Sequence, residues 1–309
     1  MASLTISLFK KFRVEKDGTA VPNLGSRKVQ ELFSYLLLHR ENLHHREELA
    51  DRLWADSTSA QSKKSLRQTL WQLQTALAPP SNADDSPVLL TELEWIGLNP
   101  GADIWLDVAD FEAAFGTCQG SPGYQLDAQT GEHLQDVVKL YSGDLLESWY
   151  QEWCLYHRER FQAMYLTMLN KLMSYCEVKR VFEDGISYGQ SILLYDRAHE
   201  RTHRYLMRLL YLSGDRTGAI RQYQRCVAAL QEELDVRPSK RTVALYQQVR
   251  EDRLQDLEVT LPELEMSASG PDANPSHQLQ CLQETLCDLQ RQLSSALQAI
   301  GVSAVHRQG

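Results

Sequence analysis

The sequence predicts a mainly helical protein with a small β component, and three observations support this. Apolar residues recur at helical spacing through most of the chain, short alternating segments surround three helices near its start, and leucines at heptad spacing follow near its end. At 309 residues the chain is long enough for two domains with cores of their own. The predicted order is a small mixed domain (1–100), a helical domain (101–258), a flexible linker (259–276) and a coiled-coil helix (277–302).

The first element is a small antiparallel sheet. Residues 4–24 alternate apolar with polar side chains, and Asp17-Gly18 predicts a hairpin turn between two strands. Two amphipathic helices follow, over residues 27–40 and 44–54.

The third predicted helix, residues 62–77, separates an apolar face from a basic and polar one. Four leucines at helical spacing form the apolar face: Leu66, Leu70, Leu73 and Leu77. The opposite face and its flanks hold cations, amides and a tryptophan: Lys63, Lys64, Arg67, Gln68, Trp71 and Gln72. Lys and Arg bind phosphates and guanine, and Gln can pair with adenine, so this face predicts a recognition helix for the DNA major groove. The alternative is an amphipathic surface helix whose polar face is solvated.

Charge bears on that choice in two ways. The formal net charge of −9 argues against a nucleic-acid-binding protein. Residues 1–100, however, carry twelve basic and twelve acidic side chains, so the whole net negative charge lies in the rest of the chain. No Asp or Glu occurs between Asp56 and Asp84, which leaves the third helix locally positive. We therefore expect DNA binding that is modest in affinity and sensitive to salt.

Trp71 has two interpretations. Its helical angle points away from the leucine face, and an exposed tryptophan is unfavourable unless something covers it. It is expected either to contact DNA, for example a thymine methyl group, or to pack against the following hairpin or the helical domain.

A hairpin completes the first domain. Residues 88–91 and 95–98 alternate around a tight turn at Glu92-Leu93-Glu94. Strands, three helices and a terminal hairpin together predict a winged helix-turn-helix. The run LFKKFRVEKDG, SRKVQELFSYLLLHR, HHREELADRLW, SLRQTLWQLQTAL and LNPGADIWLDVADFEAAF resembles the N-terminal OmpR/PhoB-like domain of the bacterial transcriptional activator domain family, which includes the Streptomyces antibiotic regulatory proteins.

This resemblance implies which residues contact DNA. In such proteins the third helix enters the major groove, the second braces the backbone and the wing contacts a flanking minor groove. The match implies that the six polar residues of the third helix lie at or near DNA and that Arg46 contacts a phosphate. The wing departs from the family pattern, because Glu92 and Glu94 stand where basic residues are common. These carboxylates are expected to repel phosphates.

The second domain is predicted to be helical almost throughout residues 106–257. The segment GDRTGAIRQYQRCVAALQEELDVRP resembles the second helix of a tetratricopeptide repeat, with Ala219, Ile220, Tyr223 and Val227 inward. Ile186 lies 34 residues before Ile220, which is the period of that repeat. The order LYSGDLLESWYQEW, RERF and DRAHERTHRYLMRLLYLSGDRTGAIRQYQRCVAALQEELDVRPS resembles the activator domain of the same family. The resemblance implies contact with RNA polymerase, another regulator or a second copy.

The C-terminal part predicts self-association. Residues 261–275 have the composition of a flexible linker. Beyond them a heptad seam runs for about three heptads, through Leu279, Leu282, Leu286, Leu289, Leu293, Ala296 and Ile300. The seam is expected to form a homo-oligomer, with docking back on its own chain as the alternative. Two tethered DNA-binding domains would suit paired half-sites.

Several other classes of protein are not favoured. Gly185-Ile186-Ser187-Tyr188-Gly189 matches a hydrolase nucleophile elbow, but its flanks are helical and no strand precedes the serine. Neither a nucleotide-binding glycine motif nor a zinc-ligand spacing is present, so no catalytic residue, cofactor or metal site is predicted. The six cysteines are scattered, no apolar run is long enough to span a membrane, and the start does not resemble a signal peptide. We therefore expect a cytoplasmic protein.

The sequence thus predicts a bacterial transcription regulator of the activator class that binds double-stranded promoter DNA through its winged helix and a protein partner through its helical domain. The alternative is a protein-interaction scaffold whose winged helix no longer binds DNA. The acidic wing and the neutral first domain favour the scaffold, and the acid-free third helix opposes it.

Overall fold

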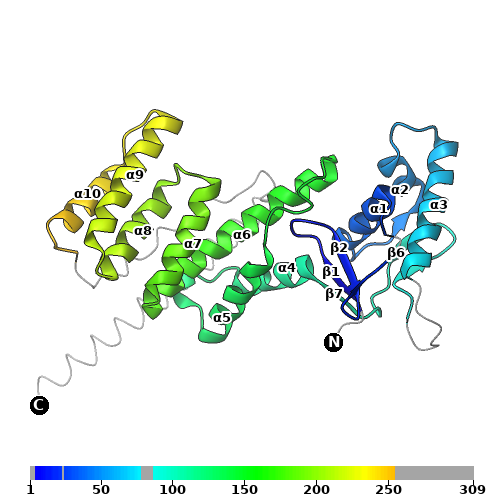
Figure 1. Cartoon of the computed structure of the whole chain (residues 1–309), viewed down its shortest axis with the longest axis horizontal. Coiled ribbons are helices and arrows are strands. Elements are labelled where there is room, and N and C mark those ends of the chain that lie inside the picture. Colours follow the sequence, from blue (N-terminus) through cyan, green and yellow to red (C-terminus); the bar gives the residue numbers. More distant parts are fainter. Residues whose placement is uncertain (1–3, 23, 78–85, 255–309) are drawn as a thin grey trace, which may run out of the picture. The chain divides into compact units, whose positions relative to one another are not determined.

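The computed structural model describes residues 4–22, 24–77 and 86–254 (Figure 1). Residues 1–256 form one compact unit. The predicted linker and the heptad seam from Leu279 to Ile300 lie outside the described residues. The described chain is mainly helical, with two small sheets near the N-terminus, which confirms the predicted fold class.

The first sheet has four strands in the order β3-β2-β1-β7. Their bounds are β1 Leu4–Ser7, β2 Arg13–Lys16, β3 Thr19–Ala20 and β7 Ile104–Leu106. The predicted turn joins β2 to β3, where Asp17 and Gly18 have φ values of 50° and 76°. Two successive positive φ values make a turn whose twist matches an antiparallel hairpin. Strand β7, which was not predicted, pairs in parallel with β1 and returns the chain to this sheet from 100 residues further on.

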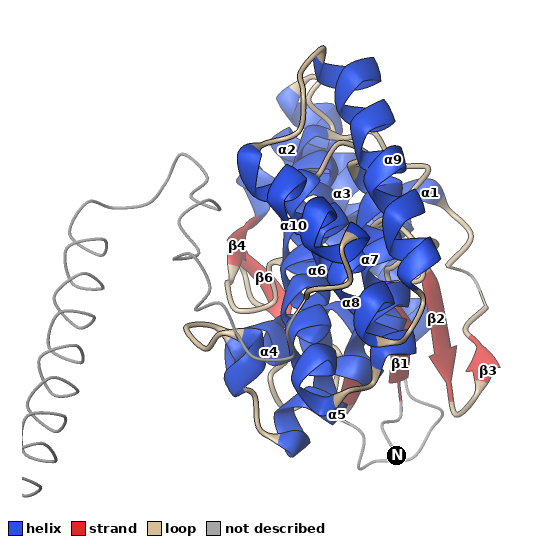
Figure 2. Cartoon of the chain, turned by 90° about the vertical axis from the view of Figure 1, so that its left-hand side faces the viewer, coloured by secondary structure: helices blue, strands red, loops and turns tan. Residues whose placement is uncertain are grey.

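Three helices and a second sheet complete the winged helix. The helices are α1 (Arg27–Leu38), α2 (Arg46–Leu53) and α3 (Ser59–Leu77). The sheet has the order β4-β6-β5, with β4 at His44–His45, β5 at Leu89–Thr91 and β6 at Trp95–Leu98. Figure 2 shows β4 beside β6. The prediction that the second helix begins at His44 was therefore wrong. His44 and His45 pair with Ile96 and Trp95 instead, and α2 begins only after this pairing ends.

The helical part follows directly on β7. It consists of α4 (Asp107–Cys118), a 3₁₀ turn η1 (Gly123–Gln125), α5 (Ala128–Val137), a 3₁₀ turn η2 (Val138–Leu140), α6 (Glu152–Lys179), α7 (Phe182–Tyr195), α8 (Glu200–Leu212), α9 (Arg216–Leu234) and α10 (Lys240–Arg250). From α6 onward each helix packs on the next one, as helix pairs of a repeat do (Figure 1). None of the helices described is both long and apolar enough to cross a membrane.

The N-terminal sheet and the helical part share one hydrophobic core. Phe9, just after β1, packs in an aromatic cluster with Phe111, Tyr141 and Phe161 at centroid distances of 5.0, 4.9 and 5.6 Å. Asp107, the first residue of α4, is 3% exposed, and its Oδ2 accepts hydrogen bonds from the backbone N–H groups of Leu8 (2.8 Å) and Phe9 (3.0 Å). The end of the first sheet and the start of the helical part are thus held together by buried aromatic contacts and by buried hydrogen bonds.

A second junction joins the end of α1 to the start of α6. The rings of Tyr35 and Trp153 meet edge to face at 5.5 Å. His157, which is 8% exposed, places its Nε2 3.3 Å from that of His39. Burial lowers the pKa of His39, and burial followed by the nearby His39 lowers the pKa of His157 to about 4. Both rings are therefore neutral near pH 7, which allows one to donate a hydrogen bond to the other.

The glycines of the elbow-like motif have a packing role. Residues 182–195 form one continuous helix, so the strand and sharp turn that a nucleophile elbow requires are not formed around Ser187. A Cβ atom added to Gly185 would lie 3.0 Å from Leu209 Cδ1, and one added to Gly189 would lie 2.6 Å from Leu206 Cδ2. The two glycines, four residues apart, let α7 approach α6 and α8 closely.

Gly189→Val is therefore expected to reduce the free energy of unfolding by about 1–3 kcal/mol, because the added side chain overpacks this contact. Ser187→Ala is the matched control: Ser187 is exposed on the same helix, and its replacement is expected to change stability by less than about 0.5 kcal/mol. Urea unfolding measures both variants. Covalent labelling of Ser187 by a serine-hydrolase probe would contradict the packing interpretation.

Helix α9 differs from the prediction in its phase. The most buried positions include Ala219, Gln222, Cys226 and Leu230, whereas Ile220, Tyr223 and Val227 are only half-buried. The reason is that α9 contacts helices on two sides: it packs on α8, and Tyr223 stacks on Tyr246 of α10 at 4.0 Å. A single inward stripe was the wrong expectation for such a helix.

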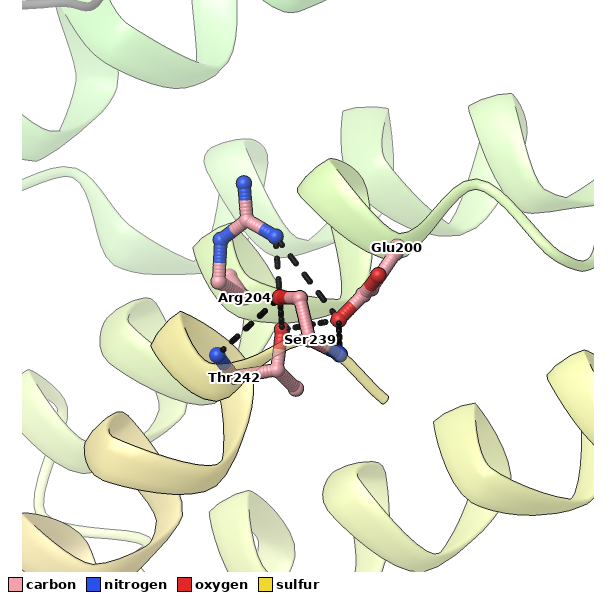
Figure 3. A network of polar contacts seen from close by, with 4 residues as sticks. All are labelled: Glu200, Arg204, Ser239 and Thr242. Atoms are coloured by element: carbon pink, nitrogen blue, oxygen red, sulfur yellow. Dashed lines mark hydrogen bonds and ion pairs between the residues drawn. The ribbon is translucent and has the colours of Figure 1, made fainter. Parts of the chain in front are cut away.

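A polar network joins α8 to the start of α10 (Figure 3). One carboxylate oxygen of Glu200 accepts hydrogen bonds from Ser239 N at 2.7 Å and Thr242 Oγ1 at 2.5 Å, and it lies 3.9 Å from the Arg204 guanidinium. Burial alone would raise the pKa of Glu200, but these hydrogen bonds lower it below the ordinary value. The carboxylate thus stays ionised at the N-terminus of α10, where negative charge is favourable.

Candidate nucleic-acid interface

Helix α3 buries its leucine face and exposes its basic face. Leu66, Leu70, Leu73 and Leu77 are at most 8% exposed. Lys64, Gln68, Trp71 and Thr75, which follow at spacings of four, three and four residues, are all exposed. This spacing places them in one row along the helix. The row lies on the side of α3 that is open to a ligand, because helices α1 and α2 pack on the other side.

The exposure of Trp71 excludes one of its two interpretations. The side chain is 65% exposed, so packing against the wing or the helical domain is wrong for the described part of the chain. A large apolar side chain stays in solvent in the middle of the basic row. Such a surface is typical of a contact site.

Three predicted site residues lie beside the row. Lys63 and Arg67 are exposed on the flank toward α2 and the wing. Gln72 is half-buried on the opposite flank, and it is the least exposed of the predicted residues on α3. Gln74, which was not predicted, is exposed and donates a hydrogen bond to Thr91 of the wing at 3.2 Å. Its place on the helical wheel next to Arg67 was the signal for it.

Lys63 carries a contact that the sequence did not indicate. Its Nζ lies 2.5 Å from Oε1 of Glu47 in the first turn of α2. The hydrogen bond and the charge of Glu47 raise the pKa of Lys63, and Lys63 in turn lowers the pKa of Glu47. Both side chains are exposed, so the pair adds little to stability. A phosphate approaching Lys63 would nevertheless have to compete with this carboxylate.

Arg46 holds the junction of α2 with the wing. Its backbone N–H donates to the carbonyl oxygen of Glu94 at 2.9 Å, and its side-chain Nε is buried without a hydrogen-bond partner among the described residues. A hollow of about 210 Å³ lies here, and it is lined by His45, Arg46, Glu47, Lys63, Leu66, Arg67, Leu93 and Glu94. Its walls therefore carry three cations and two carboxylates, which is enough for one anionic group but not a strongly positive groove.

The wing tip is acidic, as expected. Glu92 and Glu94 are exposed, and Leu93 between them is 92% exposed. Glu94 lies 3.7 Å from the His45 imidazole. Among the described residues, the positive surface of α3 and its junction with α2 thus does not continue onto the wing tip.

Comparison with known proteins adds a family and a fold. Residues 106–250 match the family model of the bacterial transcriptional activator domain. Among solved structures the chain is similar to Mycobacterium tuberculosis EmbR, determined in complex with a low-affinity phosphopeptide. The two are 18% identical, with a TM-score of 0.59 over 82% of this chain and 67% of that one. No curated protein matches the chain.

Proposed function

We propose that this chain, whose residues 106–250 match the model of the bacterial transcriptional activator domain, regulates transcription by binding promoter DNA through the exposed row of α3. The family match and the shared fold support the broad class of transcription regulator. The DNA contact is our inference from the surface of the winged helix.

One observation carries the proposal: α3 is held by its leucines while Lys64, Gln68 and Trp71 remain uncovered in a single row. Nineteen residues make a helix about 28 Å long. A helix of that length with one free face can lie in the major groove, which admits an α-helix. The first turn of α3 has no acidic residue, so its positive dipole end adds to the cations.

Each side chain has a proposed role. Lys64 would bind a phosphate, Arg67 would bind a phosphate or guanine, Gln68 would pair with a base, and Trp71 would contact a thymine methyl group. Arg46 would bind a phosphate across the hollow, and Lys63 would do so after leaving Glu47. Gln72 would contribute least, because it is half-buried.

The test is binding of the full chain to promoter fragments at low and moderate salt. Lys64→Ala is expected to weaken binding to all sequences alike. It is also expected to reduce, by about one, the slope of the logarithm of the binding constant against the logarithm of the salt concentration. Gln68→Ala is expected to cost about 1–3 kcal/mol at one base pair only. Gln190→Ala, on an exposed position of α7, is the control and should leave binding unchanged. Equal binding by wild type, Lys64→Ala and Gln68→Ala would refute the proposal.

The remaining parts of the chain have proposed roles that follow from the same class. The helical domain would contact RNA polymerase or another regulator, and the seam of Leu279, Leu282, Leu286, Leu289, Leu293 and Ile300 would form a homo-oligomer. A dimer would bring two winged helices to paired half-sites. Binding of the first winged helix would then raise the apparent affinity of the second winged helix for the other half-site. The proposal includes domain boundaries after residues 100, 258 and 276. It also includes a cytoplasmic location.

A second candidate, a protein-interaction scaffold without DNA binding, is favoured by one group of observations. Glu47 pairs with Lys63, and Glu92 and Glu94 stand at the wing tip, so carboxylates of both α2 and the wing lie along the same flank of α3. The same assay separates the two functions, because a scaffold would show no binding to promoter fragments even at low salt.

A further inference from the structure

Two imidazole rings face each other where the winged helix meets the helical part. His39 is the C-cap of α1, and His157 lies in the second turn of α6. Their Nε2 atoms are 3.3 Å apart although the residues are 118 positions apart in the sequence. This contact therefore exists only while α1 and α6 stay packed together. We call it, with the neighbouring contact between Tyr35 and Trp153, the histidine junction.

The hydrogen bonds of the pair leave room for one proton between the two rings. His39 Nδ1 lies 2.9 Å from the carbonyl oxygen of Tyr35, so it must carry a hydrogen and donate it. The Nε2 of a neutral His39 is then a bare acceptor, and the bond between the rings takes its hydrogen from His157 Nε2. The Nδ1 of His157 is consequently bare as well. It is buried without a hydrogen-bond partner among the described residues.

A second proton has no favourable place in the closed junction. On His39 Nε2 it would point one N–H group at another, and the hydrogen bond between the rings would be lost. On His157 Nδ1 it would place a positive charge on a buried ring whose N–H has no acceptor in the described part of the chain. In water both rings accept a proton near pH 6.5. Protonation therefore favours the form in which the two rings have separated.

The charged groups around the pair do not offset this cost. Glu112 of α4, which acts on His157, already accepts hydrogen bonds from Arg40 at 2.6 Å and Arg160 at 2.5 Å. Glu48 of α2 is exposed to solvent, so it offers no buried counter-charge. The titratable and charged groups that face the junction, listed by element, are Tyr35 of α1 and Arg40 after it, His44 of β4, Glu48 and Arg52 of α2, Glu112 of α4, and Arg160 of α6.

The other junction, at Phe9 and Asp107, responds to acid in the opposite direction. Burial raises the pKa of Asp107 to about 6, so its contribution to stability grows as the pH falls through 6. Burial, and then the nearby His39, lowers the pKa of His157 to about 4. The contribution of His157 is therefore fully present above pH 6.5 and is lost as the pH falls toward 4. In mild acid the histidine junction weakens while the junction at Phe9 and Asp107 holds.

We propose that His39 and His157 form an acid-sensitive contact that releases α1 from α6 when a proton is added to the pair. The contacts of Phe9 and Asp107 keep the winged helix attached to the helical part, so the opening is local. This inference goes beyond the proposed function and does not depend on it, because the junction would open with or without DNA.

A buried thiol beside the junction reports its opening. Cys154 lies one turn before His157 on α6 and is fully buried, and the charges of Arg27 and Glu31 on α1 reach it. The full-length chain is treated with a methanethiosulfonate reagent, and labelling at each cysteine is followed by mass spectrometry. The rate at Cys154, divided by its rate in the unfolded chain at the same pH, gives the opening constant, because the buried thiol reacts only when it becomes exposed.

The opening constant at Cys154 is expected to rise by about tenfold between pH 7.5 and pH 5.5, because the pKa of His157 rises from about 4 to 6.5 on opening. Cys118 of α4 is equally buried and should show no such rise. No change at Cys154, or an equal rise at Cys118, would overturn the proposal, since the second result would indicate general unfolding.

His157→Gln removes the titrating ring but keeps an N–H donor near the position of Nε2. The variant is expected to match wild type at pH 7.5 and to lose most of the tenfold rise at pH 5.5. His133→Gln is the matched control, because His133 is exposed on α5, and it should keep the full rise. An undiminished rise in His157→Gln would refute the role of the pair.

A measurement on the wild type covers the case in which His157→Gln does not fold. The NMR signal of the His157 ring is followed from pH 7.5 to pH 5. We expect this ring to stay neutral in the native form over that range. A native ring that titrates near pH 6.5 would overturn the proposal, because protonation would then carry no cost for the closed junction.

Discussion

Replacing both Lys64 and Arg67 by glutamate is expected to reduce promoter binding roughly 100-fold at moderate salt. Both side chains are exposed on α3, so the substitutions should not disturb the leucine core. Each change removes a phosphate or guanine contact and adds a carboxylate that repels DNA. Electrophoretic mobility shift or fluorescence anisotropy titration measures the affinity.

The control for this variant changes the same amount of charge elsewhere. Arg237→Glu/Lys240→Glu alters two exposed cations near the start of α10 and lowers the formal charge equally. If α3 is the DNA-binding surface, this control should bind within a few-fold of wild type, because charges beyond about 10 Å are largely screened at 0.1 M salt. Equal losses in the two double variants would indicate a non-specific charge effect and argue against a local interface.

Asp107→Ala is expected to lower the free energy of unfolding by about 3 kcal/mol. The substitution leaves the buried N–H groups of Leu8 and Phe9 without an acceptor and removes the 2.7 Å bond from Val108 N at the start of α4. Asp110→Ala is the matched control, because Asp110 is exposed on the same helix and accepts a single bond from Trp105 Nε1 at 2.6 Å. Denaturant unfolding should show a loss below about 1 kcal/mol for Asp110→Ala. Similar losses for both would contradict the role of Asp107.

The effect of Asp107 should also depend on pH. Burial raises the pKa of Asp107 to about 6 from an ordinary value of 3.8, although the three backbone N–H groups oppose this. The folded state therefore holds the proton more tightly than the unfolded chain does. The contribution of Asp107 to stability is fully present below about pH 4 and declines as the pH rises through about 6. The difference in unfolding free energy between wild type and Asp107→Ala should consequently be larger at pH 5 than at pH 7.

The features predicted from sequence are those that local patterns determine. The leucines of α3 recur every three or four residues, and this spacing alone separates a buried face from an exposed one. Asp17-Gly18 requires a turn with positive φ, and the alternation around Glu92-Leu93-Glu94 requires a hairpin. These signals extend over a few residues, so no knowledge of the tertiary structure was needed.

The features that were missed depend on segments distant in the sequence. Strand β7 has three residues and is recognisable only from its pairing with β1. The pairing of Lys63 with Glu47 depends on the angle at which α2 meets α3, and the phase of α9 depends on its having two neighbours. Trp71 was expected either to be covered or to contact a ligand, and only the packing of the other elements shows that it is uncovered.

The core shared by Phe9, Phe111, Tyr141 and Phe161 has a consequence for genetic experiments. The hydrophobic core of the winged helix is continuous with that of α4–α6. A destabilising substitution in α4–α6 would therefore also lower the amount of folded winged helix. Regulator mutants isolated by a lost phenotype would then cluster in this shared core without marking any surface that another molecule touches. Immunoblotting of each isolate for protein abundance would separate these from true contact mutants, which should accumulate to normal levels.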